Sequence, residues 1–190
     1  ISDYEVYDKD LDTMLIYSSG TLSYFNGDVF VGEFSGMSVI LEFGKMYYGN
    51  GDVYEGAFST RDNNNLEGNG YNLEMEGKGI LTYANGNKFI GSFKDNQLEI
   101  GKMYYKNGNI YDGTFDNNKF NGDGIFIYKN KDKYIGEFKN NRFDGFGTFV
   151  FSNKDIIEGN WREGDSDEKI VKKDEVDKIK KLMDNQKFNF

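Results

Sequence analysis

The sequence lacks three residue types on which much protein chemistry depends: its 190 residues include no cysteine, no histidine and no proline. Without cysteine the chain forms no disulfide and offers no thiolate to a metal. Without histidine it has no imidazole base for a nucleophilic triad and no imidazole metal ligand. Paired carboxylates remain as an acid–base option, but the acidic residues of the chain fall on one strand face or in turns. We therefore expect no enzyme activity, no metal and no cofactor.

Long apolar runs and net positive charge are also absent. No run approaches the roughly 18 apolar residues that a membrane helix needs. The formal net charge is −9, which argues against nucleic acid as a ligand, because such binding requires lysine and arginine at phosphates. It also argues against a generic anionic membrane. One basic stretch departs from this average and is a candidate lipid patch, formed by Lys129, Lys131, Lys133, Lys139 and Arg142.

What the sequence does contain is an aromatic-x-Gly-x-aromatic phrase that recurs along most of its length. The phrase begins at Phe30, Tyr54, Phe89, Tyr111 and Tyr134, and a sixth copy at Ile157 keeps the glycine and ends at Trp161. Successive copies start 22–24 residues apart, except for one interval of 35. A fixed period of this length predicts a repeat protein, in which each unit buries its apolar face against its neighbours. A degenerate copy that lacks the glycine starts at Tyr7.

A second phrase stands at a constant offset from the first. Each copy has a glycine ten residues before its start, at Gly20, Gly44, Gly79, Gly101, Gly124 and Gly147. A large apolar residue follows two positions later and an aromatic residue four positions later. Both phrases predict strands, because residues one, three and five of a strand lie on the same face.

The segments between the phrases predict tight turns. Asn-Gly pairs, such as Asn26-Gly27, predict two-residue type I′ hairpins, whereas Asn130-Lys131 and Asn153-Lys154 predict looser turns. The central glycine of the first phrase leaves a gap between two aromatic residues of one face. We expect a ring from the neighbouring strand to occupy that gap, and a row of such contacts to hold a sheet with no second layer.

These phrases resemble the MORN repeat (membrane occupation and recognition nexus). The Gly-x-Gly of that family is matched by Gly77-Lys78-Gly79, Gly122-Asp123-Gly124 and Gly145-Phe146-Gly147. The resemblance implies an all-β repeat array, a single-layer antiparallel twisted sheet of successive hairpins. We assign residues 1–164 to this array, with a degenerate first unit and a polar insertion near residues 60–76.

Residues 165–190 have a different composition. Val176, Ile179, Leu182 and Met183 fall at helical spacing, and Asp165 or Ser166 is suited to cap the start of a helix. We expect an amphipathic α-helix here. Its apolar stripe leaves two alternatives open: the helix caps the last repeat, or it binds a partner.

Proteins that the sequence resembles act as scaffolds at the cytoskeleton, in flagella and at membranes. The resemblance therefore implies a non-catalytic, protein-binding scaffold or adaptor in the cytoplasm, associated with the cytoskeleton or a membrane. Its expected partner is an amphipathic helix of another protein, held in an aromatic groove, and self-association is a further option. The predicted groove residues are Tyr54, Phe58, Phe89, Phe93, Tyr111, Phe115, Tyr134 and Phe138. The alternatives are a phosphoinositide- or membrane-binding module and an accessory domain of a larger enzyme.

Overall fold

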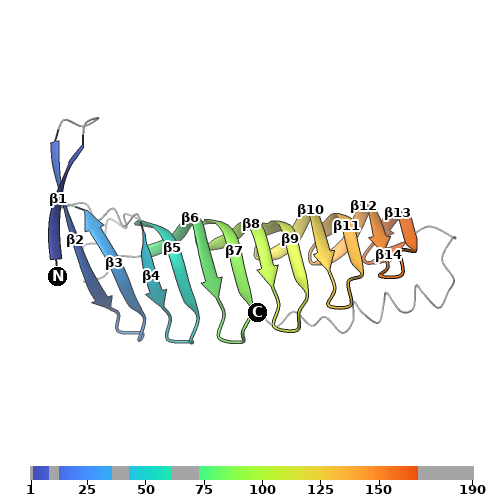
Figure 1. Ribbon diagram of the computed structural model, residues 1–190, viewed down its shortest axis with the longest axis horizontal. Helices are drawn as coiled ribbons and strands as arrows, with labels where there is room; N and C mark the ends of the chain where they lie inside the picture. Colours follow the sequence, from blue (N-terminus) through green and yellow to red (C-terminus); the bar gives the residue numbers. More distant parts are fainter. Residues whose placement is uncertain (1, 9–12, 36–42, 61–72, 167–190) are drawn as a thin grey trace. The chain divides into compact units, whose positions relative to one another are not determined.

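The computed structural model describes residues 2–8, 13–35, 43–60 and 73–166, and every regular element in these ranges is a β-strand. The predicted all-β, antiparallel fold is confirmed (Figure 1). The chain divides into two compact units, Ile1–Glu99 and Ile100–Phe190, where the sequence alone suggested one array. Within each unit, each strand lies beside its neighbours in the sequence.

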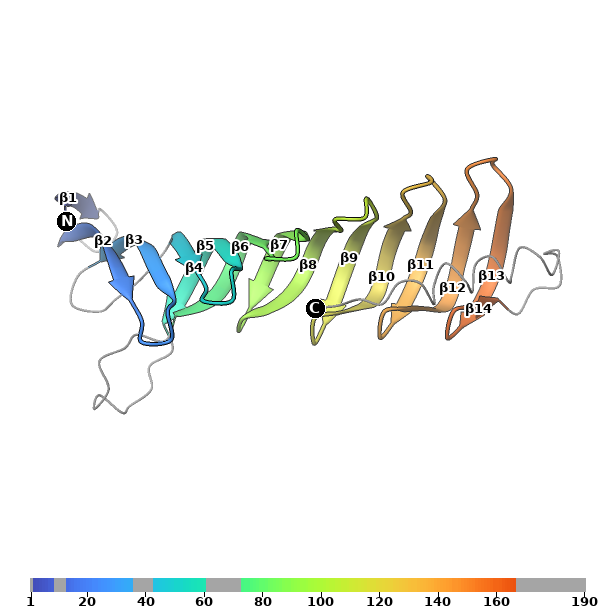
Figure 2. The same cartoon turned by 90° about the horizontal axis from the view of Figure 1, so that it is seen from below.

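The first unit contains seven complete strands: β1 (Ser2–Asp8), β2 (Thr13–Ser23), β3 (Val29–Ser35), β4 (Gly44–Tyr47), β5 (Val53–Thr60), β6 (Leu73–Thr82) and β7 (Lys88–Lys94). The second contains β9 (Ile110–Asp116), β10 (Lys119–Ile127), β11 (Lys133–Lys139), β12 (Arg142–Val150), β13 (Ile156–Arg162) and β14 (Asp165–Ser166). Strand β8 (Gln97–Tyr104) begins in the first unit and ends in the second. Strands β9 to β13 follow one another side by side in the orthogonal view as well (Figure 2).

The two glycine phrases meet in register and form a row of glycines across each sheet. In the first unit the row runs through Gly20, Gly32, Gly44, Gly56, Gly79 and Gly91, each opposite the next. In the second it runs through Gly101, Gly113, Gly124, Gly136, Gly147 and Gly159. The constant offset between the phrases is therefore the spacing that places glycine opposite glycine in adjacent antiparallel strands.

The first glycine of each Gly-x-Gly phrase has a separate task. Gly77, Gly122 and Gly145 have φ angles of +62°, +73° and +96°, and the register shifts beside each of them. Such bulges need a residue that tolerates positive φ, and they bend the strand. The bend turns the remainder of β10 and β12 towards the aromatic face, as the ring contacts described below show.

The hairpin turns at the Asn-Gly pairs differ from the prediction. Gly27 N–H donates to the carbonyl of Tyr24 at 3.0 Å, and Tyr24 N–H donates to the carbonyl of Asp28 at 2.9 Å. Of the loop residues only Gly27 has positive φ, at +90°. This is a three-residue loop in which a type I turn is followed by a left-handed residue, so the type I′ prediction was wrong.

The turns without glycine follow the same pattern and are not looser. Lys131 and Lys154 donate to the carbonyls of Tyr128 and Phe151 at 2.8 Å, as the glycines do in the other loops. Lys131 has φ +73° and Lys154 has φ +76°. Two lysines therefore adopt the left-handed conformation, which favours glycine because a Cβ atom crowds the following carbonyl.

Two-residue type I′ turns do occur, at the ends of β7, β9 and β11. Their central residues all have positive φ, and the pairs are Asp95-Asn96, Asn117-Asn118 and Asn140-Asn141. Glu163-Gly164 makes the corresponding connection from β13 to β14. We did not predict these turns, although the pairs recur in the sequence every 22–23 residues.

Both kinds of turn bind the neighbouring repeat through side chains. In the longer loops, an Asp or Asn side chain accepts a backbone N–H of the next loop. These acceptor–donor pairs are Asp28–Gly49, Asp52–Ala84, Asn109–Lys129 and Asp132–Ser152, at 2.7–3.0 Å. In the type I′ turns, the Asn96 and Asn141 side chains each accept a backbone N–H of the preceding repeat, from Met75 and Phe120, at 2.7 Å. Each hydrogen bond adds roughly 1 kcal/mol to repeat stacking.

Two predicted segments lie mostly outside the described residues. The insertion joins paired strands, with Thr60 opposite Leu73, and residues 61–72 between them are not described. The predicted helix over 165–190 falls on residues that are not described from 167 onwards. Its first two residues, Asp165 and Ser166, form β14 against Arg162 and Trp161, because the turn at Glu163-Gly164 reverses the chain there.

Replacing Lys131 with glycine should raise the free energy of unfolding by about 0.5–1 kcal/mol, because glycine removes the left-handed strain but adds freedom to the unfolded chain. The matched reverse change is Gly27→Lys, at φ +90° with no atom within 4 Å of an added Cβ. It should lower stability by a similar amount. Urea midpoints measure both, and a Lys131→Gly variant less stable than the parent would contradict this account of the loop.

Candidate functional site

The eight aromatic residues predicted to line a groove are gathered by the structure, but as a core. Their side chains have relative exposures of 0–8%. Tyr54, Phe58, Phe89 and Phe93 belong to the first unit, and Tyr111, Phe115, Tyr134 and Phe138 to the second. They share one face in each unit, which we call the aromatic face.

The rings contact each other edge to face, both within a strand and between repeats. Within strands, the pairs Tyr54–Phe58, Phe89–Phe93, Tyr111–Phe115 and Tyr134–Phe138 have centroids 4.9–5.2 Å apart and ring planes at 88–90°. Between repeats, the pairs Phe30–Phe58, Tyr54–Phe93, Tyr111–Phe138 and Tyr134–Trp161 lie at 4.9–5.2 Å. In these four pairs the first ring of one phrase also contacts the last ring of the next phrase. Such contacts are worth roughly 0.5–1.5 kcal/mol each beyond area burial.

The glycine row is the floor on which these rings lie. A Cβ atom added to Gly56 or Gly79 would come within 3.0 Å of the Tyr54 side chain. The Tyr134 ring covers Gly136 and Gly147 in the same way. The glycines do make room for a ring, but the predicted source of that ring was wrong for the central glycine of the aromatic phrase. Gly56 is covered by Tyr54 of its own strand, and a ring from the neighbouring strand covers only the opposite glycine, Gly79.

Where the first ring is tyrosine, its hydroxyl fixes the ring in place. The hydroxyl groups of Tyr54 and Tyr111 donate to the carbonyls of Ala57 and Thr114 at 2.8 Å, and Tyr134 donates to the Glu137 carbonyl at 3.1 Å. Burial, helped by nearby carboxylates, raises the pKa of all three phenols above the ordinary value of 10.0. The hydroxyls therefore remain protonated donors at neutral pH.

The residues that cover the aromatic face escaped the sequence analysis. Phe120 stacks on Tyr111 with centroids 3.7 Å apart and planes at 13°, and Phe143 stacks on Tyr134 at 3.7 Å and 8°. Both lie before the bulge in the sequence, on the part of the strand that bends towards the aromatic face. The signal was present: Leu98, Phe120 and Phe143 each follow a type I′ turn pair by two positions.

This packing decides what the aromatic face can offer. Because the eight rings are buried by one another and by the bent strands, a partner on this side would reach only their edges. The rings act first as the core of each unit. Their assignment to partner binding stays a prediction.

The opposite face of each sheet, which we call the alternate face, keeps apolar side chains in solvent. Val31, Phe43, Tyr47 and Ile90 are exposed in the first unit, and Tyr104, Ile135, Phe146 and Ile156 are exposed in the second. Two cross-strand ion pairs lie among them, Lys45–Glu55 at 3.2 Å and Lys102–Asp112 at 3.0 Å. Within each unit, no strand of the described residues lies over this face of its own sheet.

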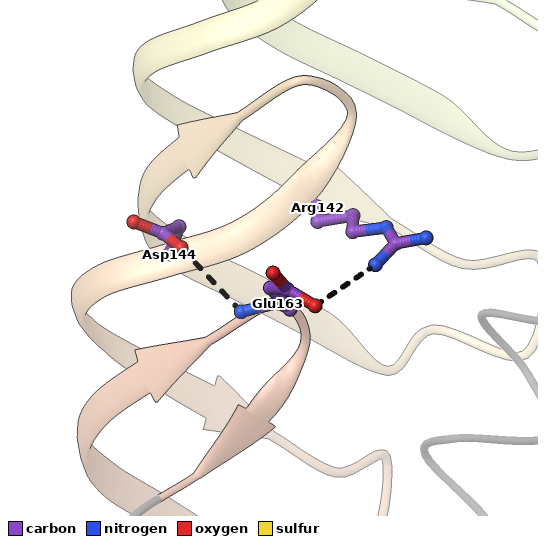
Figure 3. A network of polar contacts seen from close by, with 3 residues as sticks. All are labelled: Arg142, Asp144 and Glu163. Carbon is purple, nitrogen blue, oxygen red and sulfur yellow. Dashed lines mark hydrogen bonds and ion pairs between the residues drawn. The ribbon is translucent and has the colours of Figure 1, made fainter.

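The basic residues proposed as a lipid patch are not brought together. Lys129, Lys131 and Lys133 lie at the long loop before β11 and at its start, whereas Lys139 pairs with Arg142 at the far end of β11. Lys139 lies six residue steps along the strand from Lys133, about 20 Å. Arg142 contacts Glu163 at 3.4 Å, and the Glu163 N–H donates to Asp144 at 3.4 Å (Figure 3). This ion pair is solvent-exposed and adds little stability.

In residues 2–8, 13–35, 43–60 and 73–166, no three acidic side chains are grouped so that they could hold a metal ion. Nor do those residues form a helix of the length and apolarity that a bilayer requires.

Comparisons with known proteins match three segments of the chain to a known repeat. The sequence profile of the MORN repeat matches residues 74–88, 111–133 and 134–156. These segments hold most of β6, the hairpin β9–β10 and the hairpin β11–β12. A comparison with curated proteins gave no match.

Solved structures gave 30 matching chains. One is the TCP domain of SAS-4 (dCPAP) from Drosophila melanogaster, in complex with a proline-rich motif of Ana2 (dSTIL). It is 16% identical, the match covers 84% of this chain and 90% of that chain, and the TM-score is 0.32. A likeness at this level does not carry that protein's partner over to this chain.

A double-mutant cycle separates ring clashes from backbone clashes in the glycine row. A Cβ on Gly44 would clash with two atoms of the Phe30 ring, while the next nearest atom, the Val31 carbonyl oxygen, lies at 3.1 Å. Gly44→Ala should therefore cost about 1–3 kcal/mol of unfolding free energy, and most of that cost should disappear in a Phe30→Leu background.

Gly56 is the matched control, because its added Cβ would also meet backbone atoms, Gly79 Cα at 2.6 Å and the Lys78 carbonyl at 2.7 Å. The cost of Gly56→Ala should persist in a Tyr54→Leu background. If Gly44→Ala costs the same with and without the Phe30 ring, the ring does not occupy the slot.

The protein should lose stability in alkali. Burial, with a smaller effect of nearby aspartates, raises the pKa of Tyr48 and Tyr83 from 10.0 to about 12. The folded chain holds these two protons more tightly than the unfolded chain does, so the protonated phenols add to the free energy of unfolding. This contribution is complete below the unfolded pKa of 10 and is lost as pH rises through about 12. Urea unfolding across this range should show falling free energy. Tyr83→Phe should make the free energy of unfolding fall less steeply with pH. An unchanged dependence on pH would contradict the raised pKa of Tyr83.

Proposed function

This chain carries MORN repeats, and we propose that it is a non-catalytic protein-binding scaffold that uses a face of its repeat sheet to hold a helical segment of a partner protein. The observation that supports this most is the alternate face. A sheet face is normally covered by a second layer or made polar. Here isoleucine, tyrosine and phenylalanine side chains remain exposed in both units. Exposed apolar patches of this kind mark interaction sites.

The choice of face follows from burial. The aromatic face was our first expectation for the partner groove, but its eight rings have at most 8% of their surface exposed. A substitution such as Phe93→Ser would test folding more than binding, since Phe93 is 1% exposed. The alternate face can be altered without disturbing that core, and it offers whole side chains to a partner.

The proposal that the chain has no catalytic activity rests on its chemistry. It has no histidine and no cysteine. The Asp and Asn side chains of the longer turns accept hydrogen bonds from backbone N–H groups of neighbouring loops. These groups serve repeat stacking, which suits a scaffold. Cytoplasmic location and association with the cytoskeleton or a membrane belong to the same proposal.

Lipid binding is less well supported than protein binding. The net charge of −9 opposes adsorption to anionic bilayers. The five basic residues divide between the two ends of β11, so they do not present one cationic surface. Self-association remains compatible with the scaffold role, because exposed apolar side chains serve a second copy as well as another protein.

Affinity capture and lipid co-sedimentation, run in parallel, test the proposal. The tagged full chain should capture a protein partner that binds it directly when both are purified, with a dissociation constant of about 10 μM or tighter. Capture should survive the triple change Lys129→Glu, Lys131→Glu and Lys133→Glu. Tight, salt-sensitive binding to phosphoinositide vesicles that is lost in this triple variant would overturn the scaffold proposal. So would reproducible turnover abolished by a point mutation.

A further inference from the structure

One hairpin of the alternate face has two acidic residues in directly opposed positions of adjacent strands. In the pairing of β10 with β11, Asp123 stands directly opposite Glu137. Like charges in such cross-strand pairs destabilise a sheet. The next pair on the same face is Ile125 opposite Ile135, so two carboxylates adjoin two isoleucines.

Phe146 extends this surface onto β12. Its side chain is 54% exposed and that of Ile135 is 40% exposed. The Phe146 N–H donates to Glu137 Oε1 at 3.0 Å, which holds one carboxylate beside the phenyl ring. We call Asp123, Ile125, Ile135, Glu137 and Phe146 the acidic isoleucine patch.

We propose that the acidic isoleucine patch docks an amphipathic helix of a partner protein, one that carries lysine or arginine beside its apolar stripe. This inference rests on the proposed scaffold function and names the partner's chemistry. A cation placed between Asp123 and Glu137 relieves their repulsion, while leucine-sized side chains cover Ile125, Ile135 and Phe146. The pair that costs stability in the free chain then contributes to binding in the complex.

The dimensions agree with a helix. Apolar residues three and four apart on a helix have Cβ atoms about 5–6 Å apart, and neighbouring strands lie about 4.8 Å apart. A helix that crosses β10 and β11 therefore places successive side chains of its stripe over Ile125 and then Ile135. The nearby carboxylate of Asp112 is already paired with Lys102, which leaves Asp123 and Glu137 as the acidic pair of the patch.

The first unit supplies a built-in comparison. Ile80 stands opposite Ile90 in the same place in its repeat, and Lys78 stands opposite Ser92 where the second unit has two carboxylates. Ile90 is 39% exposed, nearly the same as Ile135. The two isoleucine pairs match in register, and the residues beside them differ in charge. A basic helix should therefore choose the second unit.

The test uses the full chain and a fluorescent helical peptide of about 18 residues, with leucine on one face and lysine on the other. A second peptide carries glutamate in place of lysine. The lysine peptide should bind, and Ile135→Ser should weaken its binding about tenfold. Ile90→Ser, the matched control, should change binding by less than about twofold. Circular dichroism shows that each variant is folded.

Charge is tested by the double variant Asp123→Asn and Glu137→Gln. It should weaken binding of the lysine peptide severalfold and reduce its salt dependence. In the free chain it should raise the urea midpoint, because the like-charge pair is gone. A role in folding alone would not change peptide affinity and stability in opposite directions.

Several results would overturn the inference. They are no binding of the lysine peptide, equal binding of the glutamate peptide, or an equal loss with Ile90→Ser and Ile135→Ser. Self-association of the chain that Ile135→Ser abolishes would assign the patch to a second copy. Tighter peptide binding after Leu182→Ser and Met183→Ser would assign it to the chain's own C-terminal residues. A purified partner that binds regardless of Ile135→Ser would overturn the patch and leave the scaffold function standing.

Discussion

The contact between an aromatic ring and a pair of backbone glycines is the interaction on which the rest of each unit depends. Tyr54, Tyr111 and Tyr134 each lie across two glycines that face each other in adjacent strands. A side chain at either glycine would lift the ring from the sheet. With the ring flat against the backbone, the last ring of the next phrase reaches its face and repeats stack through edge-to-face contacts. Glycine normally weakens a strand. Here that cost is outweighed, because a glycine without a side chain leaves room for the aromatic ring to pack against the backbone.

The sheet solves the problem of a missing second layer by bending onto itself. The left-handed glycine of each Gly-x-Gly phrase introduces a bulge, and the part of the strand before it brings Phe120 or Phe143 onto the ring of the same repeat. One face becomes a closed core, and the opposite face stays open. The turns then join successive repeats, since their Asp and Asn side chains accept backbone N–H groups of the next or preceding unit. Core, turns and bulges therefore all depend on the same 23-residue register.

Much of this architecture could be read from the sequence, and the misses have physical causes. The repeats, the strand faces and the need for glycine beside Tyr54 followed from spacing and from side-chain alternation.

The turn type at Asn26-Gly27 did not follow from the sequence, because both a type I′ turn and a type I turn with a left-handed third residue accept this pair. The turns at Asn117-Asn118 and Asn140-Asn141 were missed because asparagine is less distinctive than glycine at positive φ. The closed aromatic face could not be foreseen either: it depends on a bend at Gly122 that strand alternation alone does not express. For the candidate site, the sequence predicted eight aromatic residues on one face, and the structure gathers them there but buries them as core; their part in partner binding stays a prediction.

The most direct test of the central claim is the proton chemical shift of the glycine Hα atoms, because a proton beneath an aromatic ring is shielded and moves upfield. We expect strong upfield shifts for Gly56 and Gly79 under Tyr54. In Tyr54→Leu both resonances should return towards ordinary values, while those of Gly113 and Gly124, under Tyr111, stay shifted. Ordinary shifts for these glycines in the folded parent chain would show that the rings do not lie on the glycine row, and the account would be wrong.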